Sequence, residues 1–120
     1  MTKEELLQRT KAFALRVIKV VRALPHDDVS DVIGRQLLRS GTSVGANYRA
    51  ACRAKSTPDF LNKLKIVEEE CDESLYWMEL LVESGSMALN RLETLMREGN
   101  EILAIRVSAI RTTRARRSGA

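Results

Sequence analysis

Apolar residues recur at intervals of three and four along most of the chain, a spacing that places them on one face of an α-helix. The first such stretch runs from about Lys3 to Leu24, and its apolar face is formed by Leu6, Phe13, Val17, Val20 and Leu24. A second row, which widens this face to roughly 160°, consists of Leu7, Ala14, Ile18 and Val21. One explanation for so wide a face is a second burial partner, for which self-association is the obvious candidate. Pro25 ends the helix because the residue before a proline disfavours helical dihedrals.

The second helical stretch continues to about Ala54, and its candidate N-caps are Asp27, Asp28 and Ser30. Three glycines lie on its apolar face, namely Gly34, Gly41 and Gly45. Each glycine costs about 1 kcal/mol relative to alanine inside a helix, so three of them indicate close packing against a neighbouring helix. The alternative is a helix that breaks near residues 40–42. No phosphate-binding glycine motif fits this stretch.

The third and fourth helical stretches carry clear start and stop signals. Thr57 is a favourable N-cap, Pro58 suits the first helical position, and Asp59 suits the positive helix end. Gly85 supplies a left-handed stop, and Ser86 is then expected to cap the fourth helix. Four helices with short connections predict an all-α domain over residues 1–111, an up-down-up-down antiparallel four-helix bundle. Residues 112–120 are predicted to form a basic, flexible C-terminal tail.

Composition and charge set limits on this prediction. The chain has 120 residues and is 44% apolar, which is too high for a disordered chain. No apolar run approaches the roughly 20 residues that span a bilayer, and the charged N-terminus lacks a signal-peptide pattern, which predicts a cytoplasmic protein without a membrane partner. The net charge is +4, yet residues 58–84 carry two basic against eight acidic side chains, whereas the rest of the chain is basic.

Few residues suit catalysis or metal binding. The single histidine, His26, lies in a predicted loop, so the Glu-x-x-His pairs of a di-metal bundle are missing from the sequence. Cys52 and Cys71 occupy apolar helix positions and are interpreted as small core residues. Most acidic side chains of the third helix project onto its polar face, whereas Glu70 borders the apolar seam. We therefore predict a non-enzymatic protein without a metal or cofactor.

Basic side chains give the most informative pattern. Four arginines lie within about 80° of one another beside the apolar face of the second helix, namely Arg35, Arg39, Arg49 and Arg53. Two interpretations remain open, pairing with the acidic third helix or contact with phosphate groups, to which arginine geometry is suited. The patch is extended by Lys11, Lys19, Arg22, Arg111, Arg114, Arg116 and Arg117. Aromatic platforms are sparse, so sequence-specific base reading is not predicted, and Tyr76 is the best candidate for an exposed aromatic contact.

Two stretches carry a family resemblance. GRQLLRSGTSVGANYR at residues 34–49, and DFLNKLKIVEEE at residues 59–70 followed by Glu73 and YWMELL at residues 76–81, resemble the four-helix-bundle family of ribosomal-RNA intervening-sequence proteins. The accessory variability determinants of diversity-generating retroelements are similar proteins. The resemblance covers about residues 5–110. It implies an antiparallel bundle that assembles as a homopentamer, often with a basic surface and without enzymatic activity.

The resemblance also implies partners. For intervening-sequence proteins it implies an association with ribosomal-RNA insertions, and for the retroelement relatives it implies binding to nucleic acid and to a reverse transcriptase. The first hypothesis is therefore a homo-oligomeric scaffold that binds RNA or other nucleic acid, including DNA, through its basic surface. The alternative is an adaptor whose basic surface docks an acidic protein partner or a reverse transcriptase.

Overall fold

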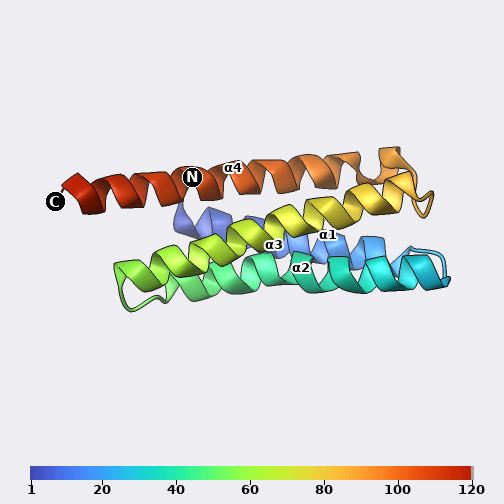
Figure 1. The fold of residues 1–120 in the computed structure, drawn as a ribbon, viewed down its shortest axis with the longest axis horizontal. Helices are drawn as coiled ribbons and strands as arrows, with labels where there is room; N and C mark the ends of the chain where they lie inside the picture. Colours follow the sequence, from blue (N-terminus) through green and yellow to red (C-terminus); the bar gives the residue numbers. More distant parts are fainter. Residues whose placement is uncertain (120) are drawn as a thin grey trace.

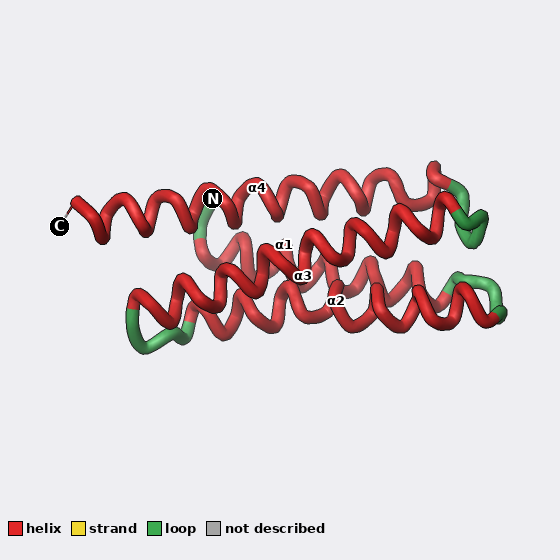
Figure 2. Tube along the Cα trace, in the orientation of Figure 1, coloured by secondary structure: helices red, strands yellow, loops and turns green. Residues whose placement is uncertain are grey.

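The computed structural model describes residues 1–119, apart from the side chains of Val107 and residues 117–119. Four helices fill most of this range, namely α1 (Lys3–Arg22), α2 (Asp28–Cys52), α3 (Thr57–Glu83) and α4 (Leu89–Gly119). Residues 1–119 contain no strand (Figure 2), and the all-α, four-helix prediction is confirmed. The backbone of α4 stays helical past the predicted domain end at residue 111. The flexibility of residues 112–120 stays a prediction, and Ala120 lies outside the described residues.

The helices lie side by side, and the connections between them alternate between the two ends of the molecule (Figure 1). Helix α1 packs against α2 and α4, and α3 packs against the same two helices, so that α1 and α3 occupy opposite sides. The result is an elongated body of 53 × 22 × 21 Å. The start of α1, the end of α2, the start of α3 and the end of α4 therefore share one end of the molecule (Figure 1).

The starts of the first two helices follow the local sequence signals. Thr2 and Glu5 form a capping box at the start of α1, in which the side chain of each accepts a backbone N–H of the other. Asp27 caps α2 by accepting the backbone N–H of Ser30 at 2.8 Å, which decides among the three predicted candidates. A cap satisfies backbone donors that the first helical turn leaves free, so these side chains fix where each helix begins.

Two predicted N-caps were wrong by one or more residues. Ser56, rather than Thr57, caps α3 and accepts the backbone N–H of Asp59 at 3.2 Å, so that Thr57 is the first helical residue. Gly85 has a φ of +82° after the end of α3, as predicted, but Ser86 does not cap α4, which begins at Leu89. The hydroxyl of Ser86 instead accepts a hydrogen bond from Ser30 at 2.9 Å and ties this loop to α2.

The three glycines of α2 all face α1 at close range, and α2 continues unbroken through residues 40–42. A Cβ at Gly34 would lie 2.9 Å from Leu24, and a Cβ at Gly41 would lie 2.8 Å from both Cγ atoms of Val17. At Gly45 the nearest atom would be the backbone oxygen of Thr10, at 3.3 Å. The glycine row thus lets the two helices approach more closely than side chains would allow.

The core draws on all four helices. Its fully buried large side chains include Phe13, Leu37, Leu64, Met78, Leu81, Leu92 and Ile102. Cys71 lies in this core, where its thiol donates to the backbone oxygen of Gly99 at 3.2 Å and burial raises its pKa to about 12. Cys52 is only half-buried. The second apolar row predicted on α1 is also half-buried, and two of its members, Leu7 and Ala14, border the groove between α1 and α2.

Candidate nucleic-acid interface

The four arginines of the α2 stripe lie in three different environments. Arg39 is one case, Arg49 and Arg53 are the second, and Arg35 is the third. In the middle of the stripe, Arg39 donates to Glu70 at 3.1 Å and to Glu73, both on α3. Glu73 also accepts a hydrogen bond from the indole of Trp77 at 3.1 Å. For Arg39, pairing with the acidic third helix is therefore the correct interpretation, and this guanidinium is engaged within the chain.

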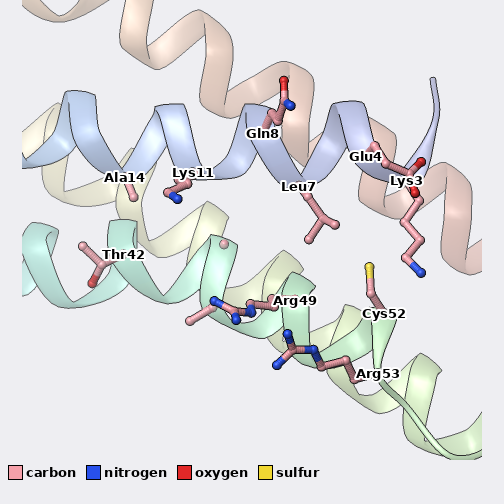
Figure 3. Close-up of a pocket in the computed structure, with 12 residues that line it drawn as sticks. Lys3, Glu4, Leu7, Gln8, Lys11, Ala14, Thr42, Arg49, Cys52 and Arg53 are labelled. Carbon is pink, nitrogen blue, oxygen red and sulfur yellow. The ribbon is translucent and has the colours of Figure 1, made fainter.

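Arg49 and Arg53 lie in a different environment, along a groove between α1 and α2 with a volume of about 720 Å³. Figure 3 shows both side chains on α2, with Lys3 and Lys11 extending from α1. Within the described residues, neither arginine has a carboxylate within ion-pair distance, since the ion pairs there are formed by Arg9 and Arg39.

The groove is lined by both small and charged side chains. The small ones are Ala14, Thr42, Gly45 and Ala46, and the charged ones are four cations, Lys3, Lys11, Arg49 and Arg53, and one carboxylate, Glu4. A second groove, between α2 and α3, is lined by the same Arg49 and Arg53 together with Lys55, Asp59 and Lys63. The two arginines therefore stand on a ridge of α2 between two grooves that both carry lysines. Such a row of guanidinium and ammonium groups suits a chain of phosphates.

Charge is separated along the length of the bundle. Residues 1–11, 47–65 and 105–116 share one end, and together they carry twelve Lys and Arg against three Asp and Glu. The two stretches between them, residues 12–46 and 66–104, carry seven Lys and Arg against thirteen Asp and Glu. We call the first region the basic end. Its exposed and half-exposed cations are Lys3, Lys11, Arg49, Arg53, Lys55, Lys63, Lys65, Arg111, Arg114 and Arg116.

Two further arginines of the basic end are held inside the molecule. Arg9 donates to Glu98 at 2.7 Å and also to Glu101, and the hydrogen bond from Arg9 lowers the pKa of the Glu98 carboxyl. Arg106 is only 2% exposed and lies 4.6 Å from the centre of the Tyr48 ring. Burial lowers the pKa of Arg106 and raises that of Tyr48 to about 12. Among the described atoms, the Nε of Arg106 has no hydrogen-bond partner.

The structure does not bring the remaining predicted residues to this site. Arg35, Lys19 and Arg22 are exposed but belong to the half of α1 and α2 that is remote from the basic end. Arg117 lies outside the described side chains. Tyr76 is exposed as predicted, but it lies on the acidic helix α3, where its ring meets Trp77 edge-on at 5.2 Å.

The sequence interpretation missed four lysines, namely Lys3, Lys55, Lys63 and Lys65. They lie close to helix ends rather than on the arginine stripe. Lys63 and Lys65 also fall within residues 58–84, where eight acidic side chains outnumber them. The signal was nevertheless present in the sequence. A bundle with alternating connections brings the ends of successive helices together, so counting charge by bundle end would have found these lysines.

The described residues offer no group of three or more His, Cys, Asp and Glu side chains placed to hold a metal ion. None of the helices in residues 1–119 is long and apolar enough to cross a membrane. Together, the fold and the site define a small, all-α helical-bundle protein with a basic end.

The chain belongs to the family described as 23S rRNA-intervening sequence protein, whose profile matches residues 2–108. It is also similar to the crystal structure of a protein of unknown function from the S23 ribosomal protein family of Bacteroides thetaiotaomicron. The two share 34% identity and a TM-score of 0.86, over 92% of this chain and 99% of that one. None of the curated proteins compared with the chain matches it significantly. The intervening-sequence resemblance is confirmed, whereas the similarity to retroelement accessory proteins stays a prediction.

Proposed function

We propose that the protein is a non-enzymatic, up-down-up-down antiparallel four-helix bundle that assembles as a homopentamer and binds RNA or other nucleic acid through its basic end. The observation that carries the proposal is the gathering of ten accessible cations at one end of the bundle. At its centre, Arg49 and Arg53 stand between two lysine-lined grooves with no carboxylate in ion-pair contact among the described residues.

The chemistry of the basic end favours contact with the phosphate backbone. Guanidinium and ammonium groups neutralise phosphates and release counterions, a driving force that does not depend on base sequence. Of the two aromatic residues in the described basic end, Tyr48 is buried beneath the surface and Phe60 is half-buried, so neither offers an exposed stacking platform. The family description names a sequence within ribosomal RNA, which supports a structured RNA as the ligand.

Assembly strengthens this binding in a simple way. If copies are related by rotation about an axis along the bundle, their basic ends lie on one face of the oligomer. Phosphate contacts from neighbouring copies then act on a single RNA, and binding gains from multivalency without any new contact type. A pentamer would present five copies of the Arg49 and Arg53 ridge on that face.

The test is a titration of a fluorescently labelled, structured RNA with the protein at several salt concentrations. For about four phosphate contacts per binding event, counterion release predicts an affinity loss of roughly 100-fold between 50 and 200 mM salt. Failure to bind RNA at 50 mM salt, or binding that is insensitive to salt, would contradict the proposal. Binding of an acidic polypeptide such as polyglutamate, without binding of RNA, would favour the alternative function. In that function the protein is an adaptor that docks an acidic protein or a reverse transcriptase.

A further inference from the structure

The outer surfaces of α1 and α3 carry rows of opposite charge on opposite sides of the molecule. The row on α1 consists of Lys11, Leu15, Lys19 and Arg22, and the row on α3 of Glu69, Asp72, Tyr76, Glu79 and Glu83. All of these side chains are exposed, and within the described residues none of the charged ones forms an ion pair in its own chain. Each row also holds a large apolar side chain, Leu15 at 59% exposure and Tyr76 at 52%.

The two rows lie at matching levels along the bundle. Gly41 of α2 lies against Val17 of α1, and the neighbouring Ser40 accepts a hydrogen bond from Ser74 of α3 at 2.9 Å. Val17 and Ser74 are therefore at about the same height. Helices α1 and α3 run in the same direction (Figure 1), and every residue adds the same rise in both.

Counting outward from this level pairs the members of the two rows. Leu15 falls at the level of Asp72, and Lys19 falls at the level of Tyr76. Arg22 falls at the level of Glu79, with Glu83 one turn further along. A rotation about an axis parallel to the bundle moves a second copy without changing its height. Each residue of the α1 row in one copy therefore stays level with the matching residue of the α3 row in the next copy.

We propose that a second copy of this chain docks the α3 row on the α1 row, with the two helices parallel and in register. This docking rests on the proposed homo-oligomeric assembly and identifies its interface. Leu15 then lies opposite Asp72, and Lys19 lies opposite Tyr76. Leu15 and Tyr76 are one helical turn apart and together form the apolar part of the contact, and Lys19 and Arg22 lie beside Glu79 and Glu83. An apolar centre with complementary charges around it is the usual organisation of a specific interface.

The charge pattern also selects the symmetry of this contact. A two-fold pairing of α1 with α1 would place the cationic row of one copy against the cationic row of the other. A two-fold pairing of α3 with α3 would likewise place carboxylates against carboxylates. A contact between two different surfaces avoids both, and such head-to-tail contacts generate closed rings when the rotation divides a full turn. The basic ends of all copies then point the same way, as the proposed RNA binding requires.

Cysteine cross-linking tests the contact directly. Leu15→Cys and Asp72→Cys, whose positions lie at the same level in the proposed contact, are each made in a Cys52→Ser background, since Cys71 is buried and stays unreactive. Disulfide geometry requires Cα atoms within about 7 Å, so the mixture of the two variants is expected to form a covalent dimer under mild oxidation, whereas each variant alone forms none. Val32→Cys is the matched control, since Val32 is 52% exposed on α2 and lies outside both rows. Its mixtures with either variant are expected to stay uncross-linked.

Charge exchange provides a second readout in light scattering. Lys19→Glu with Arg22→Glu, and separately Glu79→Lys with Glu83→Lys, are each expected to weaken association on the order of 100-fold, because like charges then face each other. Combining all four changes is expected to restore the oligomer. A wild-type monomer would overturn this docking together with the proposed assembly. If the wild-type protein is an oligomer but the Leu15→Cys and Asp72→Cys variants form no cross-link and the charge reversals leave association unchanged, the docking alone is overturned.

Discussion

Replacing Arg49 and Arg53 together with glutamate is expected to weaken RNA binding by at least about 100-fold. Both guanidinium groups stand on the ridge between the two grooves without a carboxylate in ion-pair contact among the described residues. The replacement therefore removes two phosphate contacts and adds two repulsive charges. Because every phosphate contact contributes to the salt dependence, the slope of affinity against salt is expected to fall by about two. Fluorescence anisotropy with a labelled, structured RNA measures both quantities.

Arg91→Glu with Arg97→Glu is the matched control for this prediction. It changes the net charge by the same amount at two exposed positions of α4 outside the basic end. We expect this control to lose far less affinity than the ridge variant at the same salt concentration. Equal losses in the two variants would show that overall charge, rather than the basic end, governs binding. Circular dichroism on both variants establishes that the helices remain folded.

Replacing Gly41 with valine is expected to destabilise the fold by about 3 kcal/mol, the upper part of the range for an overpacked core. Even a single Cβ at this position would lie 2.8 Å from both Cγ atoms of Val17. Since valine is branched at Cβ and stiff in a helix, neither side chain can turn away, and α1 and α2 must separate. Such a loss is a large share of the roughly 5–15 kcal/mol that stabilises an ordinary domain.

Urea unfolding followed by circular dichroism measures this change. Ala46→Val is the control, because Ala46 is an exposed residue of the same helix and its replacement introduces the same branched side chain without the clash. We expect the control to lose only a few tenths of a kcal/mol through helix propensity. A Gly41→Val variant as stable as the control would contradict the role given to the glycine row.

Local signals in the sequence predicted most of the fold. The apolar spacing predicted four helices, Gly85 marked the end of α3 correctly, and the glycine face of α2 indicated a close neighbour. Asp27, which caps α2, was one of three candidates that the sequence left open. The errors at Thr57 and Ser86 arose where several capping residues stand together and the local signal does not choose among them. That the close neighbour is α1 could not be read from periodicity alone, because this depends on how the helices are arranged around the core.

The candidate site was harder to predict because it depends on which parts of different helices meet. Rotation by 100° per residue placed Arg35, Arg39, Arg49 and Arg53 on one side of α2, but it says nothing about what lies opposite each residue. In the structure, carboxylates of α3 engage Arg39, whereas Arg49 and Arg53 lie along grooves lined by lysines. A net charge of +4 concealed this separation because the two ends of the bundle nearly cancel.

Lysine footprinting tests most directly the claim that the basic end contacts nucleic acid. The chain has six lysines, of which Lys3, Lys11, Lys55, Lys63 and Lys65 belong to the basic end and Lys19 does not. The protein is acetylated with and without saturating RNA, and mass spectrometry measures the modification of each lysine. We expect RNA to reduce the acetylation of Lys3, Lys11, Lys55 and Lys63 and to leave that of Lys19 unchanged. Bound RNA that protects Lys19 instead, or that protects no lysine of the basic end, would contradict the account.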